Sequence, residues 1–135
     1  MRHPLVTFDG VHCSIILRRP TERVVILEIQ GRDTGELGDA PFKELAKDLE
    51  VGRLDLFIDA RKTLGAGLDV SGQWAQWLRT NKGRFRRVSM LTGSRFVQLT
   101  AEFVRRFAEM GDTMNVYTDA ASFETALSLT LASEP

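Results

Sequence analysis

Five residues that follow predicted strands have side chains that could contact an anion or another ligand. Asp59, Arg61 and Lys62 follow one strand, and Ser94 and Arg95 follow a later one. Each segment leads into a predicted helix, whose free N–H groups and dipole attract negative charge. We therefore expect a phosphate-bearing group or another anionic ligand to fit here. Ser and Asp at such positions are also common helix N-caps, so simple capping is the alternative interpretation.

Motifs of the common enzyme classes are missing from the sequence. Gly65-Ala66-Gly67 has the start of a dinucleotide-binding pattern, but the third glycine is missing because position 70 is Val70. The P-loop, serine-hydrolase, zinc-protease and dithiol motifs are also absent. His3 and His12 have no metal-ligand spacing with Cys13 or with each other. We therefore predict no catalytic residues, no metal site and no cofactor, and a protein that is not an enzyme.

Length and composition predict one globular domain spanning residues 1–135. The chain is 43% hydrophobic and 27% charged, and its 18 basic residues balance its 18 acidic ones, which gives no overall attraction to nucleic acid or membrane. Cys13 is the only cysteine, so no internal disulfide can form and a reducing, cytoplasmic location is expected. The N-terminus lacks the core of a signal peptide, and no apolar run approaches the roughly 18 residues that cross a bilayer.

The hydrophobic periodicity indicates which elements must position these residues. Strands are predicted at Leu5–Phe8, Cys13–Leu17, Val24–Ile29, Leu54–Ile58, Val88–Leu91 and Met114–Tyr117. Helices are predicted to contain Phe42–Leu49, Val70–Asn81, Phe96–Met110 and Phe123–Leu131. The order βββαβαβαβα predicts an α/β fold with a mixed, mostly parallel sheet, four helices and an N-terminal antiparallel hairpin that turns at Asp9-Gly10.

Two predicted helices carry large apolar side chains. Trp74 and Trp77 lie three residues apart and therefore share one face of the second helix. We expect both to fill the core against the sheet, although an exposed tryptophan there would be an interface anchor. The third helix is predicted from the helical spacing of Phe96, Leu99, Phe103, Phe107 and Met110.

Basic residues gather in one part of the chain, although the total charge is zero. Between positions 79 and 106, Glu102 is the single acid against Arg79, Lys82, Arg84, Arg86, Arg87, Arg95, Arg105 and Arg106. This asymmetry favours a polar partner surface or association between copies of the chain, with solvated helix edges as the alternative. Phe85 lies among these arginines, but one aromatic side chain without a recognised module gives little reason to expect a nucleic-acid partner.

Asp69-Val70-Ser71-Gly72 stands at the start of the second predicted helix. Together with the order of elements, this motif is similar to that of STAS domains, named for sulfate transporters and anti-sigma factor antagonists. Antagonists of that family carry Asp-Ser-Ser-Gly here, and a partner kinase phosphorylates the second serine. The resemblance implies Ser71 as the phosphoacceptor, with Asp69 and Gly72 as retained neighbours. Val70 replaces the first serine. With this departure, the chain also resembles the STAS-like branch that is related to the lipid-binding Sec14 domains.

Two functions follow as hypotheses. The first is a regulatory module that binds a protein partner, such as a kinase or regulator, and is switched by phosphorylation at Ser71, which requires an exposed Ser71 hydroxyl. A phosphate there would add about −1.5 to −2 charges at a helix N-terminus and would displace a partner docked over it. The second is a small-molecule or lipid binder that uses the cleft at the strand ends or an apolar pocket beneath the helices. Ser71 as a plain N-cap or first-turn residue is the structural alternative.

Overall fold

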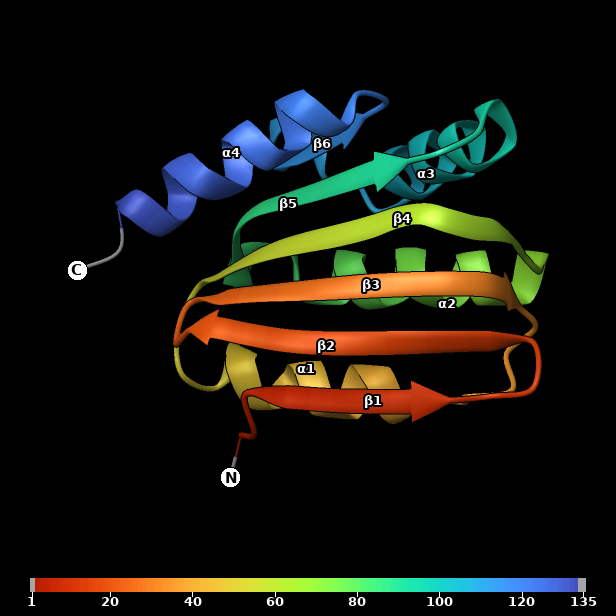
Figure 1. The fold of residues 1–135 in the computed structure, drawn as a ribbon, viewed down its shortest axis with the longest axis horizontal. Helices are drawn as coiled ribbons and strands as arrows, with labels where there is room; N and C mark the ends of the chain where they lie inside the picture. The colour runs from red at the N-terminus through yellow and green to blue at the C-terminus, as the bar shows by residue number, and fades with distance from the viewer. Residues whose placement is uncertain (1, 134–135) are drawn as a thin grey trace.

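A six-stranded mixed sheet organises the computed structural model, which describes residues 2–133 (Figure 1). Its strands are β1 (Leu5–Asp9), β2 (Cys13–Thr21), β3 (Val24–Asp33), β4 (Leu54–Ala66), β5 (Phe85–Thr92) and β6 (Met114–Tyr117). They lie side by side in chain order; β1, β2 and β3 pair antiparallel, and β3 to β6 pair parallel. The predicted fold class, a mixed α/β sheet with an N-terminal hairpin, is therefore confirmed.

Helices cover both faces of this sheet. They are α1 (Ala40–Leu49), α2 (Leu68–Thr80), α3 (Arg95–Phe107) and α4 (Ala120–Ala132), with short 3₁₀ turns at Lys82–Arg84 and Gly111–Thr113. Figure 1 shows α1, α2 and α3 behind the sheet, and the main core forms between them and the back of the strands. On the other face, Phe123 of α4 packs against Val24, Phe57 and Leu91. The two tryptophans have the predicted core role, since Trp77 stacks between Phe42 of α1 and Phe85 of β5.

Strand β4 is longer than the sequence predicts. The alternation of apolar residues stops at Asp59, but backbone pairing with β3 continues through Gln30 with Lys62 and Asp33 with Ala66. Irregular register after Glu28 and again after Gly31 accommodates these polar and glycine-containing segments. The expected loop from Asp59 to Ser71 therefore does not exist, and β4 runs almost directly into α2.

A buried cluster of charges joins α1 to the hairpin. The Arg19 guanidinium of β2 donates to both carboxylate oxygens of Asp48, at 2.9 and 3.0 Å, and to Glu44 at 2.9 Å. Arg2 adds a contact of 3.1 Å to Asp48, whose side chain is fully buried. Because Arg19 and Asp48 are buried together, each charge is stabilised by the other instead of by water.

We predict that Asp48→Ala lowers the free energy of unfolding by about 3–5 kcal/mol, because the buried Arg19 guanidinium loses the carboxylate that binds it with both oxygens and keeps the single ion pair with Glu44. Asp39→Ala is the matched control on the same helix, since its ion pair with Lys43 is solvent-exposed and should contribute little. Urea denaturation of both variants measures the difference. Equal, small losses would show that the cluster does not hold α1 in place.

Glu36 holds the tip of the β1–β2 hairpin against the segment that follows β3. Its carboxylate accepts hydrogen bonds from the backbone N–H groups of His12 at 2.7 Å, Cys13 at 2.9 Å and Val11 at 3.1 Å. These bonds, with that from His12 the strongest, lower the pKa of Glu36 below its ordinary value of 4.5. Gly31 belongs to the same junction: its φ is +86°, and any side chain there would collide with the His12 carbonyl.

Glu36 should make stability depend on pH. Its pKa is lower in the folded chain than in the unfolded chain, so its contribution is complete above about pH 4.5 and is lost as the pH falls through the folded value. We predict that Glu36→Gln lowers the thermal midpoint at pH 7, and that the gap to wild type narrows below pH 4.5. Thermal melts from pH 3 to pH 7 measure this; a gap independent of pH would contradict it.

Candidate functional site

A groove opens between the start of α2 and the length of α3, where β4 and β5 end. This is the edge at which ligands of parallel sheets usually bind. The groove has a volume of about 560 Å³. Its lining consists of Ala66, Leu68 and Ser71 on the α2 side and Arg95, Phe96, Leu99, Thr100 and Phe103 on α3. Apart from Arg95 and two hydroxyl groups, the lining side chains are apolar.

An inner cavity of about 80 Å³ lies beneath the groove, between α2, α3 and the sheet. Its wall is almost entirely apolar, with the Asp33 carboxyl group and a few hydroxyl groups as exceptions. Ala66, Ser71 and Thr100 line both spaces, so they form the neck between them. The cavity has about half of the roughly 150 Å³ that admits benzene in an engineered apolar cavity, so it suits a small apolar group rather than a whole lipid.

Helix α3 has two apolar faces, and only one of them packs on the sheet. Val97, Ala101 and Val104 are buried, and Ala108, just beyond the helix, continues the same face. Four of the five residues whose spacing predicts the helix point away from the sheet, and the fifth, Met110, is buried beyond the helix end. Between 46% and 55% of the surface of each remains exposed at Phe96, Leu99, Phe103 and Phe107, which we call the α3 stripe.

One leucine extends this exposed apolar surface across the groove. Leu68, the first residue of α2, lines the groove opposite α3 and is 91% exposed. Single exposed leucines are common in proteins, but a continuous group of aromatic and aliphatic side chains beside a groove is typical of an interaction site. Sequence analysis missed this surface. The signal was present, because apolar residues occupy a wider arc of α3 than one sheet face can cover.

Ser71 does not lie where the phosphorylation hypothesis requires it. The side chain is buried, with 5% of its surface exposed, so the expectation of an exposed hydroxyl is wrong. Helix α2 begins at Leu68 rather than near Val70, and Gly67 occupies the N-cap. Ser71 is therefore the fourth helical residue, and its N–H donates to the Gly67 carbonyl at 3.0 Å. That position turns the side chain toward α3 and the neck of the groove.

The other residues of the motif differ from Ser71 in their exposure. Asp69 is exposed in the first turn of α2, where its negative charge suits the positive end of the helix dipole. Gly72 is half-buried within the helix, and an added Cβ there would meet no atom within 4 Å. Neither residue lines the groove, so the three do not converge on one binding point.

Asp59 and Arg61 neutralise each other. The Arg61 guanidinium donates to both Asp59 oxygens, at 3.1 and 2.8 Å, and lies 3.6 Å from Glu124 of α4. Burial raises the pKa of Asp59, but the Arg61 hydrogen bonds outweigh it, so the pKa falls below its ordinary value. Lys62 is exposed within β4. Arg61, the main cation expected to bind an anion in this segment, is therefore already paired within the chain, and an anion site here stays a prediction.

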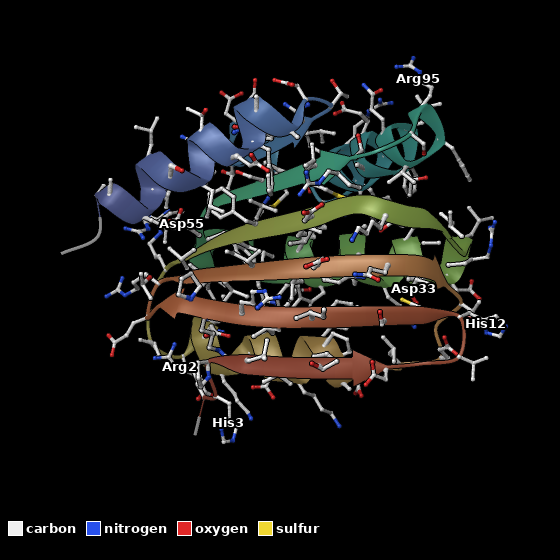
Figure 2. The ribbon with its side chains drawn as sticks, viewed as in Figure 1. Arg2, His3, His12, Asp33, Asp55 and Arg95 are labelled. Atoms are coloured by element: carbon white, nitrogen blue, oxygen red, sulfur yellow. The ribbon has the colours of Figure 1, made fainter. Side chains whose placement is uncertain are left out.

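Ser94 and Arg95 begin α3 and have different roles. The Ser94 hydroxyl accepts a hydrogen bond from the Val97 N–H at 3.2 Å, so it is the N-cap of the helix. Arg95 lines the groove with Ser71, and its guanidinium donates to the neutral amide of Gln98 at 3.2 Å. Figure 2 shows Arg95 projecting from the molecule at the start of α3. Of the five predicted anion contacts, Arg95 alone lines the groove.

Within residues 2–133, no three His, Cys, Asp or Glu side chains are close enough to share a metal ion. His3 and His12 lie at opposite ends of the sheet (Figure 2), and His12 contacts Glu36 at 3.5 Å. Burial, helped by the charges of Asp33 and Glu36, raises the pKa of Cys13 to about 11, so its thiol is protonated at neutral pH. None of the helices in this range has the length and hydropathy to span a bilayer.

Two solved structures have the same fold. One is SpoIIAA, described as an anti-sigma factor antagonist, in its unphosphorylated form; it aligns with a TM-score of 0.63 and 15% identity over 90% of this chain and 99% of its own. The other is an uncharacterised protein of the DUF3478 family from Shewanella loihica PV-4 with a SpoIIAA-like fold, at a TM-score of 0.60 and 15% identity over 89% and 98%.

No family model and no curated protein sequence matches this chain. The likeness to the two structures therefore establishes a SpoIIAA-like, STAS-type fold, in agreement with the resemblance seen in the sequence. Identity of 15% does not extend the likeness to individual site residues.

We predict that Ser71→Asp destabilises the fold by about 3 kcal/mol, because it buries a carboxylate in the cavity wall that Asp33 already lines. Gln73→Asp adds the same charge at an exposed position of the same helix and should have little effect. Ser71→Ala should be tolerated, since alanine favours the helix. Chemical denaturation compares the three; a Ser71→Asp variant as stable as the Gln73→Asp variant would show that Ser71 reaches solvent.

Proposed function

We propose that this protein is a non-enzymatic module that binds a protein partner through the α3 stripe and the adjoining groove. The exposed stripe carries the proposal. Four large apolar side chains, each about half exposed, follow one helix, and no other element within residues 2–133 covers them. Leaving that much apolar surface in water forgoes stabilisation of about 25 cal/mol per Å², which a bound partner would recover.

The fold supports a regulatory role of this kind. SpoIIAA, which has the same fold, is described as an anti-sigma factor antagonist, a description that implies action on another protein. The groove itself is poorly equipped for acid–base catalysis, because its lining residues include no carboxylate, imidazole or amine that could exchange a proton with a substrate. The mainly apolar lining instead suits the binding of an apolar partner.

In this proposal, Ser71 is phosphorylated in an opened form of the groove. In the described arrangement a kinase cannot reach the hydroxyl, which is 5% exposed. Separation of α2 from α3 would expose it at the neck. A phosphate added there would place about −1.5 to −2 charges in the wall that holds Asp33, and repulsion would keep the neck open. Phosphorylation would then change the shape of the partner surface as well as its charge.

A small apolar ligand is the second candidate function. The inner cavity favours it, because the cavity connects with the groove through Ala66, Ser71 and Thr100 and is lined mainly by apolar side chains. Native mass spectrometry of protein purified from its source tests this idea. A reproducible added mass that is lost on denaturation would support it, and the bare chain mass would count against it.

The main proposal predicts that protein capture depends on the α3 stripe. Leu99→Ser and Phe103→Ser should each abolish capture of a specific partner from the source cells, because each removes an apolar anchor. Leu129→Ser is the matched control, since Leu129 is a 67% exposed leucine on α4, across the sheet. Quantitative pull-down with all three variants, checked for folding by circular dichroism, measures this. Equal capture by stripe and control variants would refute the proposal.

A further inference from the structure

We infer that the partner covers the α3 stripe with an amphipathic helix carrying acidic residues about three turns apart beside its apolar face. This inference rests on the proposed function and goes further, because it states the chemistry of the partner. The shape of the stripe, the charges beside it and the poor fit of other occupants support it independently.

The stripe has the dimensions of a helix-binding surface. Its four members are spaced by three, four and four residues, so they form a continuous ridge along α3. From Phe96 to Phe107 this ridge is about 16 Å long at 1.5 Å per residue. The rings of Phe103 and Phe107 lie 5.8 Å apart and extend the ridge beyond the groove, whose lining ends at Phe103. A small ligand in the groove would leave Phe107 uncovered, whereas a three-turn helix would cover the whole ridge.

A row of charges borders this ridge on its outer side. Arg95, Glu102 and Arg106 follow one another at intervals of seven and four residues, so they share one edge of α3, next to Leu99 of the stripe. Arg95 and Arg106 are exposed at the two ends of the row. Glu102 lies between them and pairs at 3.6 Å with Arg105, which belongs to the next row. The pattern along the edge is therefore positive, negative, positive.

A partner helix can match that pattern, because each of its positions can carry a different charge. Acidic side chains facing Arg95 and Arg106, with a basic or neutral side chain facing Glu102, would make every contact along the edge favourable. Since the two arginines are eleven residues apart, the two acids of the partner are expected at about the same separation. The apolar anchors of the partner would lie beside them and enter the groove next to Leu68.

Other occupants fit the charge pattern less well. A second copy of the chain would bring arginine against arginine, since antiparallel packing of two α3 helices puts Arg95 opposite Arg106 and parallel packing puts each opposite itself. An anionic lipid surface carries one sign of charge. It would meet Glu102 within the row and Asp69 beside Leu68 with repulsion at both.

A displayed library of helical 18-residue peptides tests the inference. The apolar positions are fixed as leucine, and the flanking positions vary among Glu, Lys and Gln. Selection on the full chain should enrich Glu at two flanking positions about eleven residues apart. The selected peptide should bind the Arg95→Glu/Arg106→Glu double variant about tenfold or more weakly, and a second selection on that variant should enrich Lys instead.

Three controls make the outcome decisive. Arg18→Glu/Lys43→Glu changes the net charge equally at exposed positions of β2 and α1 and should leave binding unchanged. Phe103→Ser should abolish binding, whereas Leu129→Ser should not. Selected peptides without charge preference, or with unchanged affinity for the double variant, overturn the inference. Two further results would also overturn it: a dimer in sedimentation that Phe103→Ser abolishes, and flotation of the chain with phosphatidylglycerol vesicles that Phe103→Ser abolishes.

The same variants separate this inference from the proposed function. If a cellular partner is captured through the stripe but is indifferent to the Arg95→Glu/Arg106→Glu change, the module binds proteins and the acid-flanked helix is wrong. If capture does not depend on the stripe at all, the proposed function itself fails.

Discussion

The long parallel pairing of β3 with β4 determines where every part of the candidate site lies. Both strands are buried over their first halves, and the pairing continues to Asp33 and Ala66 although the later residues are polar or glycine. Because β4 reaches Ala66, it leaves one residue, Gly67, before α2 begins. The start of α2 is thereby held beside α3, and the groove, its neck and the burial of Ser71 all follow from that placement.

The second determinant is the choice of which face of α3 packs on the sheet. Ala101 and Ala108 are fully buried, and their small size lets the helix approach the strands closely. A phenylalanine at either position would need a volume that the approach does not leave. The large residues are therefore on the face that the sheet does not cover. The helix is apolar on both faces: one packs against the sheet, and the other is the surface that we propose a partner covers.

Local patterns in the sequence predicted the elements but not their lengths or their facing. The bounds of β6 were predicted as Met114–Tyr117, since a short apolar run between turns is a local signal. The end of β4 was wrong because backbone pairing with β3 extends a strand that side-chain alternation no longer marks. Ser71 was misplaced because its exposure was expected from the family resemblance alone. It precedes Ala75 by four residues and Leu78 by seven, so it shares their buried face of α2. The bond of Arg19 to Asp48 joins residues 29 positions apart, a distance that no local pattern spans.

Internal pairing also explains why few of the predicted charged residues remain suited to binding. Arg61, one of the predicted contacts, is paired with Asp59 and Glu124, so it stabilises the fold. Arg95 differs because its hydrogen bond goes to a neutral amide, which leaves its charge uncompensated at the edge of an apolar groove. In the proposed complex, a cation beside aromatic and aliphatic side chains would provide orientation and selectivity, while the apolar contacts would provide affinity. That division of roles is characteristic of protein recognition, in which a central apolar cluster is surrounded by a polar rim.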